Sequence, residues 1–206
     1  MEHLIKQFKE IPTTAISDAM EGLNNLDSGI KPLKEDFRCA GRALTVQLPV
    51  GDNSAVLKAI GEARPGDILV VDSKGDTYRA IAGDFVIGMM KTMNIGALVV
   101  DGMVRDLEAV KELNFPVFSR GTTVASSGKA GLGKTNLPIS CGGVTVNPGD
   151  LIIGDVDGVV VVPQSRCEEI LEKAKDKLMK DEQRAEKYAG NPETIRKYIA
   201  MMTSKS

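Results

Sequence analysis

Two carboxylates and one guanidinium stand at a fixed spacing near the middle of this chain. Asp84 is followed by twenty residues and then by the adjacent pair Arg105 and Asp106. The free amides at a helix N-terminus attract anions, and carboxylate oxygens are ligands that hard divalent cations prefer. If these three side chains meet at the start of a helix, they can hold a divalent cation together with an anionic substrate.

The residues between them form one compact unit, which predicts that the three side chains do meet. Residues 84–93 have the pattern of a helix, and residues 97–100 form a short apolar strand. A helix of about ten residues rises roughly 15 Å, and the returning strand is of similar length. Asp84 and the Arg105–Asp106 pair should therefore lie at the same end. The structural alternative is an ion pair between Arg105 and Asp106 that caps a helix over residues 106–113.

The scarcity of histidine almost excludes several kinds of catalytic and metal site. His3 is the only histidine, so Ser-His-Asp and Cys-His catalysis and His-rich zinc sites are disfavoured. Cys39, Cys141 and Cys167 are far apart and include no C-x-x-C pair, which favours buried structural thiols in a reducing compartment. Carboxylates, lysines, arginines and backbone groups must therefore carry any chemistry.

Length and composition indicate one globular domain that does not bind nucleic acid. A chain of 206 residues with 42% hydrophobic content can bury one sizeable core. The net charge is -2, from 26 basic and 28 acidic residues, and aromatic residues make up only 4%. Neither a basic stripe nor a base-stacking surface is evident. Because we find no signal-peptide pattern and no apolar run of about 18 residues, we expect a soluble cytoplasmic protein without a membrane segment.

Cap and turn signals place the remaining elements of the body. We expect one helix over residues 13–20, capped by Thr13 or Thr14, and another over residues 54–60, capped by Asn53 or Ser54. The Asp-Val-Asp-Gly segment at 155–158 superficially resembles a calcium loop but lacks the remaining ligands, so a hairpin turn is favoured. Apolar runs bounded by glycine and proline predict strands over residues 41–48, 68–71, 151–153 and 159–162.

The chain from Ser165 onward is predicted to be helical. Ser165 and Glu168 form a capping-box pattern, Gly190 ends the long helix, and an Asn-Pro-Glu segment at 191–193 starts a short one. An apolar stripe with steps of three and four indicates that the long helix packs on another surface. Its members are Leu171, Ala174, Leu178, Ala185 and Tyr188.

Two acidic residues lie on or beside this stripe. Asp181 falls on the stripe, and Glu182 is adjacent to it. An acid on an apolar stripe belongs either to a local solvated patch or to a site to which its carboxylate is presented, including a site on another subunit. The residues alone leave both interpretations open.

Residues 128–135 match the phosphate-binding pattern G-x-x-x-x-G-K-[ST]. That pattern binds phosphate when a buried strand precedes it and a helix N-terminus follows it. Here Pro138 and the Gly142–Gly143 pair follow, which a regular helix does not accommodate, and residues 122–127 make a poor buried strand. A nucleotide loop is therefore disfavoured against a flexible Gly/Lys loop or a loop that closes over an anionic site.

Three ordered blocks resemble the RraA-like family over about residues 14–163. This family includes class II pyruvate aldolases, which depend on a divalent metal and cleave 4-hydroxy-4-methyl-2-oxoglutarate and related oxo-acids. It also includes non-catalytic regulators that bind an endoribonuclease. The predicted C-terminal helices favour the enzyme, because the regulators are typically shorter. The blocks are the Asp84, Arg105 and Asp106 spacing, the loop from Gly121 to Lys134, and residues 141–150 leading into residues 155–163.

The resemblance implies a role for each residue of this spacing. Asp106 would bind Mg²⁺ or Mn²⁺ directly, and Arg105 would bind the oxo-acid and its developing enolate. Asp84 would hold a metal-bound water. The backbone amides of Phe85 and Val86 would hold the substrate carboxylate, as a helix N-terminus favours.

The resemblance also implies an architecture, an assembly and an activity. We expect an α/β chain with a swivelling beta/beta/alpha domain over residues 1–163 and a helical extension over residues 164–206 that packs on the body or on a neighbour. Homotrimers or homohexamers are expected, with a C-terminal acid from a neighbouring subunit, Glu182 or Asp181, completing the site. The implied activity is metal-dependent cleavage of 4-hydroxy-2-oxo acids to pyruvate. Oxaloacetate decarboxylation should accompany it because both reactions form the same enolate.

Overall fold

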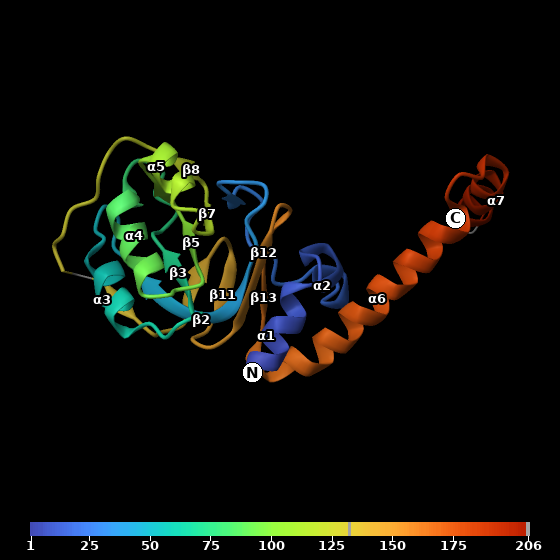
Figure 1. Ribbon diagram of the computed structural model, residues 1–206, viewed down its shortest axis with the longest axis horizontal. Coiled ribbons are helices and arrows are strands. Elements are labelled where there is room, and N and C mark those ends of the chain that lie inside the picture. Colours follow the sequence, from blue (N-terminus) through green and yellow to red (C-terminus); the bar gives the residue numbers. More distant parts are fainter. Residues whose placement is uncertain (132, 205–206) are drawn as a thin grey trace.

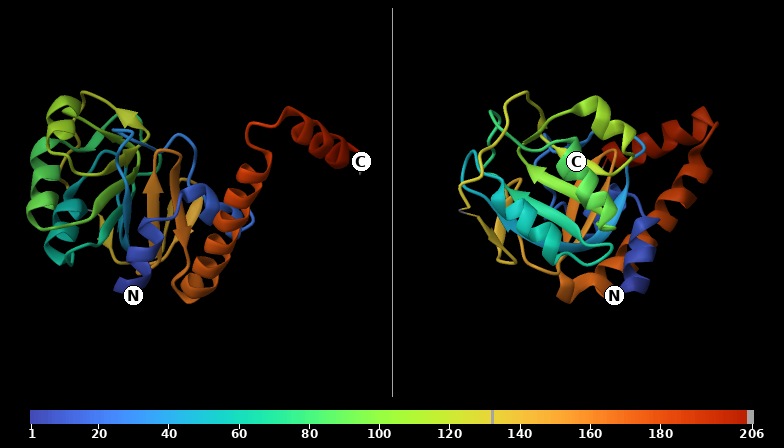
Figure 2. Two further views of the ribbon diagram at one scale, coloured as in Figure 1. Left: turned by 45° about the vertical axis from the view of Figure 1, so that its right-hand side comes forward. Right: turned by 60° about the vertical axis from the view of Figure 1, so that its left-hand side comes forward.

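The computed structural model describes residues 1–131 and 133–204 and confirms the mixed α/β fold (Figure 1). Leu132, in the predicted Gly/Lys loop, and residues 205–206, at the end of the predicted extension, lie outside the described residues. The main sheet has the strand order β1-β7-β5-β3-β2-β12-β13, and β9 pairs with β2 beside this path. Layers of helix lie on either side of the body in Figure 2.

Parallel strands form the centre of the main sheet. They are β2 (Cys39–Gln47), β3 (Ile68–Asp72), β5 (Ala97–Asp101) and β7 (Val117–Ser119). Their apolar runs are buried on both faces, as parallel strands require. One face is covered by α3 (Ser54–Glu62), α4 (Asp84–Thr92) and α5 (Leu107–Glu112).

An antiparallel hairpin extends the sheet on the other side of β2. It consists of β12 (Leu151–Asp155) and β13 (Gly158–Val162), which confirms the hairpin turn expected at residues 155–158. Side chains alternate between two cores: Ile152 packs with Phe118, whereas Leu151 packs with the helices at the two chain ends. The small hairpin of β10 (Ile139–Cys141) and β11 (Val144–Val146) closes the first of these cores.

The N-terminal and C-terminal helices pack together against this hairpin. They are α1 (Glu2–Lys9), α2 (Thr13–Ala19) and the first part of α6 (Cys167–Tyr188). Ile170 and Ala174 of α6 are fully buried, but the helix then leaves the body. It is followed by α7 (Pro192–Thr203), which lies apart from the body in Figure 1 and in the left view of Figure 2. Of the sequence stripe, Leu171 and Ala174 are buried against the body, Leu178 is half-buried, and Tyr188 packs on Tyr198 of α7 with ring centroids 4.6 Å apart.

A second sheet lies beside the carboxyl ends of the parallel strands. It contains β4 (Ala80–Ala82), β6 (Met103–Val104) and β8 (Gly121–Thr122), all parallel. β4 leads directly into α4, and β6 leads directly into Arg105. Asp84 and Arg105, which stand at the two ends of the predicted spacing, therefore follow neighbouring strands. The shortest remaining strands are β1 (Lys31–Pro32) and β9 (Lys134–Thr135).

Several predicted helix caps are wrong, although the helices themselves are present. Thr13 is the first residue of α2 and donates its hydroxyl to Asp155 at 2.6 Å instead of capping the helix. Asn53 occupies the N-cap position of α3 without a side-chain cap bond. Ser165 lies in a 3-10 turn over Gln164–Arg166, so the capping box with Glu168 does not form. In each case the side chain has a competing partner or a competing local geometry that sequence spacing does not reveal.

The cysteines confirm the expectation of buried structural thiols. Cys39, Cys141 and Cys167 are all free and buried. Burial raises the pKa of Cys39 to about 12 and also raises the pKa of Cys141 and of Cys167, which disfavours the reactive thiolate at neutral pH.

In the described part of the chain, no helix has both the length and the apolar character needed to cross a membrane.

Candidate active site

The N-terminus of α4 is the centre of the candidate site. Gly83 precedes the helix, and Asp84 is its first residue, as the sequence predicts. The Asp84 carboxylate accepts a hydrogen bond from the Phe85 amide at 2.7 Å. The amides of the first helical turn have no carbonyl partner within their own helix, so this end of α4 favours an anion.

Arg105 and Asp106 lie directly against Gly83. A Cβ atom built on Gly83 would be 2.2 Å from Oδ2 of Asp106 and 3.1 Å from Nε of Arg105. These contacts confirm that the spacing brings the pair to the start of α4. Arg105 is held there by its backbone amide, which donates to the Ala82 carbonyl at 3.0 Å.

The conformation of Asp106 is unusual for a residue that is not glycine. Its φ is 58°, in the left-handed region, and it occupies the N-cap position of α5 without a side-chain cap bond. Its Oδ2 lies 3.3 Å from Nε of Arg105. The ion pair of the structural alternative is therefore present, but the carboxylate faces Gly83 instead of capping α5. Strained backbone of this kind persists where surrounding contacts impose it, often at functional sites.

A cavity of about 260 Å³ opens at this point. Asp84, Phe85, Val86 and Arg105 line one part of it, while Asn53 at the start of α3 lines another. Ala80, Ala82 and Gly83 complete the wall together with Ser126, Ser127 and Lys129 from the segment after β8. Asp84 and Arg105 thus share a cavity with part of this segment, whereas Asp106 does not line the cavity and lies against Gly83 at its edge.

Two oxygen atoms in the cavity wall are buried without a hydrogen-bond partner in the described chain. They are Oδ1 of Asn53 and Oγ of Ser127. Asn53 itself is only 8% exposed, and its Nδ2 donates to the Ile81 carbonyl at 2.9 Å, which directs its oxygen elsewhere. Buried polar atoms without a partner cost free energy, so these two oxygens are available to bond a polar ligand or a water molecule in the cavity.

Asn53, Ser127 and Lys129 are residues of the cavity wall that the sequence pattern does not single out. The pattern places Asn53 at a helix cap and the other two only within a loop. No spacing signal links Asn53 to Asp84, because the contact depends on how α3 packs beside α4. Of these three residues, only Lys129, in a glycine-rich loop, indicates an anionic ligand by its residue type.

Comparison with known proteins agrees with this geometry. A family model described as Aldolase/RraA matches residues 13–161, which is more than half of the chain. The chain belongs to the RraA-like family. The resemblance inferred from the three sequence blocks is thereby confirmed.

Proteins similar to this chain carry different names. A Halalkalibacterium halodurans protein named "Putative 4-hydroxy-4-methyl-2-oxoglutarate aldolase" is 57% identical over 198 residues, covering 96% of this chain and 94% of the relative. A solved structure of an uncharacterized protein from Pseudomonas syringae has a TM-score of 0.84 at 28% identity, covering 97% and 94%. The RNA-processing inhibitor RraA from Thermus thermophilis has a TM-score of 0.69 at 30% identity, covering 75% of this chain and 94% of that one.

The acidic side chains of this RraA-like site fit only a metal ion that takes one or two ligands from the protein. Among the described residues, no group of three or more His, Cys, Asp or Glu side chains could hold a metal ion. The Asp106 side chain is 39% exposed and Asp84 is exposed, so both carboxylates reach solvent. This donor set fits a cation that keeps most of its water, as Mg²⁺ does when it binds through one or two carboxylates and a substrate. A closed structural zinc site does not fit.

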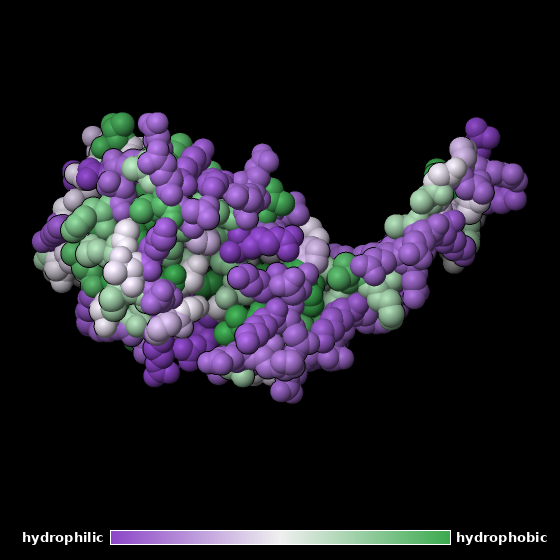
Figure 3. Space-filling view, in the orientation of Figure 1, coloured by the Kyte–Doolittle hydropathy of each residue, from purple (hydrophilic) through white to green (hydrophobic). Residues whose placement is uncertain are grey.

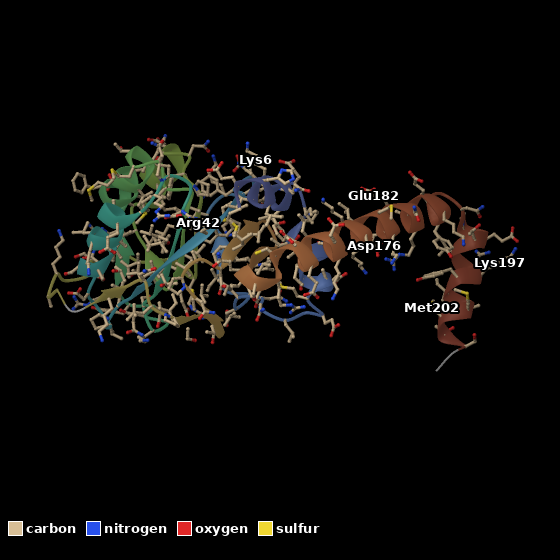
Figure 4. The ribbon with its side chains drawn as sticks, turned by 90° about the horizontal axis from the view of Figure 1, so that it is seen from below. Lys6, Arg42, Asp176, Glu182, Lys197 and Met202 are labelled. Atoms are coloured by element: carbon tan, nitrogen blue, oxygen red, sulfur yellow. The ribbon has the colours of Figure 1, made fainter. Side chains whose placement is uncertain are left out.

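The C-terminal acids do not reach the cavity of their own chain. Asp181 forms ion pairs within α6, with Lys177 at 3.7 Å and with Arg184. Glu182 lies on the projecting part of α6, outside the globular body (Figure 4). This part of α6 extends from the side of the body opposite α4 and α5 (Figure 1). Any contribution of Glu182 or Asp181 to a site must therefore come from another copy of the chain.

The phosphate-loop pattern does not form a phosphate loop. Lys134 and Thr135 are the two residues of β9, which pairs antiparallel with Val46 and Gln47 of β2. A Cβ atom on Gly133 would be 2.4 Å from Cβ of Ala55, so the glycine is needed for close packing against α3. Because a strand stands where a P-loop has its helix, the backbone amides are not arranged around a phosphate.

Proposed function

We propose that this protein is a divalent-metal-dependent lyase that cleaves 4-hydroxy-2-oxo acids to pyruvate. The observation that carries the proposal is the placement of Arg105, Asp84 and the first amides of α4 in one cavity, with Asp106 against Gly83 at its edge. The aldolase name of the relative that is 57% identical supports the same reaction class. The 4-hydroxy-4-methyl-2-oxoglutarate type is the substrate class that we assign.

The reaction breaks the bond between C3 and C4 of the substrate. The 4-hydroxyl group loses its proton and becomes a carbonyl, while the electrons of the broken bond pass into an enolate at C2 and C3. Protonation of that enolate at C3 gives pyruvate. The protein must therefore bind a carboxylate, accept a proton and stabilise an enolate oxygen.

The residues of the cavity suit these three tasks. The first-turn amide of Val86 and the positive end of α4 favour the substrate carboxylate, while the Phe85 amide is already bonded to Asp84 in this structure. The guanidinium of Arg105 stabilises the developing enolate. Asp84 is the carboxylate in the cavity wall that can receive the hydroxyl proton, directly or through water.

A metal would be held by Asp106, with Asp84 bonding to its water. When bound, Mg²⁺ or Mn²⁺ supplies a Lewis acid for the keto oxygen. Oxaloacetate decarboxylation is the expected side activity, because loss of carbon dioxide from oxaloacetate leaves the same enolate. The absence of histidine from the cavity is compatible with this chemistry, since neither step needs an imidazole.

A non-catalytic regulator that binds a ribonuclease is the second candidate. The fold shared with the RNA-processing inhibitor RraA favours it. However, that structure matches over 94% of its own length and over only 75% of this chain, so this chain carries additional sequence. We favour the lyase for that reason and because the cavity holds buried polar atoms without partners.

Pyruvate release distinguishes these candidates. A panel of 4-hydroxy-2-oxo acids and oxaloacetate should yield pyruvate in the presence of Mg²⁺ or Mn²⁺, and a chelator should abolish the reaction. If no acid is cleaved, or if the rate does not respond to chelator, the lyase proposal is wrong. Binding of a ribonuclease by a protein without turnover would support the regulator instead.

A further inference from the structure

Two segments that are far apart in the sequence are bonded together beside the cavity. The Asn53 amide donates to the Gly128 carbonyl at 3.1 Å, and the Gly128 amide donates to the Gly51 carbonyl at 2.7 Å. The first segment leads into α3, and the second carries the Ser126–Gly131 part of the Gly/Lys loop. Both segments contribute to the cavity wall, so their contact sets the width of the cavity at this side.

The Asp52 carboxylate adds a second layer to this contact. Its side chain is 4% exposed. Oδ1 accepts from the Ser54 amide at 2.8 Å, and Oδ2 accepts from the Ala130 amide across the gap between the segments. The Ser54 hydroxyl then accepts from the Gly131 amide at 3.0 Å. Asp52 and Ser54 therefore hold two consecutive loop amides from the start of α3.

The ionised form of Asp52 suits this arrangement. Burial by itself raises the pKa of Asp52, but the amides of Ser54 and Ala130 donate to it and bring the pKa below its ordinary value. A carboxylate offers acceptors on both oxygens, whereas an asparagine offers only one and would point an NH₂ group at an amide donor. A cap for α3 alone needs only the bond to Ser54, so the bond to Ala130 requires another explanation.

The position of Lys129 explains the bond from Ala130 to Asp52. It lies between Gly128, which is bonded to the first segment, and Ala130, which is bonded to Asp52. We propose that Asp52 is a positioning residue that fixes the Ser126–Gly131 segment on the start of α3, and so holds Ser127 and Lys129 at the wall of the substrate cavity. This deepens the proposed function and depends on it for its kinetic consequence.

The first test does not depend on any activity. Trypsin cleavage after Lys129, followed by mass spectrometry, should be slow in the wild-type protein and at least about tenfold faster in Asp52→Asn, since proteolysis follows local opening. Ser54→Ala removes the Gly131 bond and the long bond from the Ser54 hydroxyl to Oδ2 of Asp52 at 3.5 Å, but it keeps the bond between Asp52 and Ala130, and it should give an intermediate rate. Thermal unfolding of each variant shows whether the body remains folded during the assay.

Asp150→Asn is the matched control. Asp150 is also a buried turn carboxylate that accepts backbone amides, from Asn147 at 2.8 Å and from Gln164 at 3.1 Å. It precedes β12 beside Ala43 in the middle of β2, and its carboxylate bonds Asn147 and Gln164 instead of the Ser126–Gly131 segment. Asp150→Asn should lose stability without faster cleavage after Lys129.

The kinetic test uses the oxo-acid with the highest wild-type rate. Asp52→Asn should raise KM by about tenfold and should change kcat less. The reason is that loop residues bind substrate and transition state alike. A tenfold rise in KM corresponds to the loss of about one hydrogen bond to a charged group. Equal cleavage of wild type and Asp52→Asn, or an equal rise in KM for Asp150→Asn, overturns the inference. If the wild-type protein cleaves no oxo-acid, the proposed function fails, while the trypsin test still decides whether Asp52 holds the loop.

Discussion

At the scale of single residues, substitution of Gly83 leads to a prediction about activity that does not rest on stability. Its φ of -126° suits any residue, but a Cβ atom would overlap Oδ2 of Asp106. Gly83→Ala should therefore displace Asp106 and lower pyruvate formation by about 100-fold, since misplacement by about 1 Å has effects of that size. Gly88→Ala, on the same helix with no atom near the new methyl group, should keep the activity and gain up to about 1 kcal/mol of stability. Similar activities for the two variants would contradict the geometry.

Substitutions of the three spaced residues separate their proposed roles. Asp106→Asn removes a charge from the metal site, so metal affinity and turnover should fall together. Asp84→Asn should be milder for metal affinity, with losses of about 10 to 100-fold from a disturbed bond to metal-bound water, and it should also slow turnover because it removes the group that receives the hydroxyl proton. Arg105→Lys keeps the charge but loses the planar fork, so turnover should fall while metal binding survives. Titration with Mg²⁺ or Mn²⁺ and pyruvate assays decide this. An Asp106→Asn variant with near wild-type metal-dependent activity would favour the structural ion pair.

The sequence predicted some residues of the candidate site better than others. Asp84, Arg105 and Asp106 could be found because one helix and one strand separate them, and the lengths of those elements fix where they meet. Asn53 and Ser127 could not be found in this way, since their unpaired oxygens become evident only when α3 and the loop are packed together. Local periodicity determines the first kind of contact, and tertiary packing determines the second.

At the scale of elements, the apolar runs and glycines located the helices from α2 to α7 and the longer strands β2, β3, β5, β12 and β13, but they missed α1 and the shorter strands, including β7 and the second sheet. The caps were unreliable. The helix expected over residues 84–93 is α4, ending one residue earlier, and Asn191 caps α7 as predicted, accepting from the amides of Glu193 and Thr194 at 3.1 Å. By contrast, Asp52 rather than Asn53 bonds the first amide of α3. Burial of apolar faces determines where an element lies, but several neighbouring polar side chains can compete for its ends.

The position of strand β9 also leads to a prediction about nucleotide binding. Since Lys134 lies in a strand paired with Gln47, Mg-ATP and Mg-GTP should not bind at physiological concentrations. Isothermal titration calorimetry up to about millimolar nucleotide should show no binding heat, a limit that corresponds to roughly -4 kcal/mol. A micromolar dissociation constant that Lys134→Ala abolishes would restore the phosphate-loop interpretation.

The two parts of α6 should respond differently to truncation. Removing residues 180–206 keeps the buried residues Ile170, Leu171 and Ala174, so the thermal unfolding temperature should remain near that of the full chain. Removing residues 164–206 uncovers the core beneath α6, where each buried large side chain contributes about 2 to 5 kcal/mol. That variant should fail to fold, because total stability is about 5 to 15 kcal/mol. Circular dichroism melting curves test both, and equal melting would contradict this division.

At the scale of the whole molecule, the projecting arm formed by residues 180–204 predicts self-association. Hydrophobic side chains remain exposed along it (Figure 3). A single chain offers them no surface to pack on, and it leaves Glu182 on the projecting part of α6, outside the globular body (Figure 4). A second copy of the chain would address both. The exposed apolar residues on and near the arm are Met179, Ile195, Ile199, Met201 and Met202.

We expect the homotrimer or dimer of trimers that the family resemblance implies, with each arm packed on a neighbour. Light scattering of the full chain should give three or six times its mass of 22.0 kDa, and removal of residues 180–206 should lower both the mass and the activity. Glu182→Gln should retain the assembly and, if this carboxylate completes a neighbour's site, weaken metal-dependent turnover. Glu186→Gln, on the same arm, is the matched control and should change neither. A 22.0 kDa monomer at micromolar concentration with full activity would contradict the shared site, because the arm would then have no partner to act on.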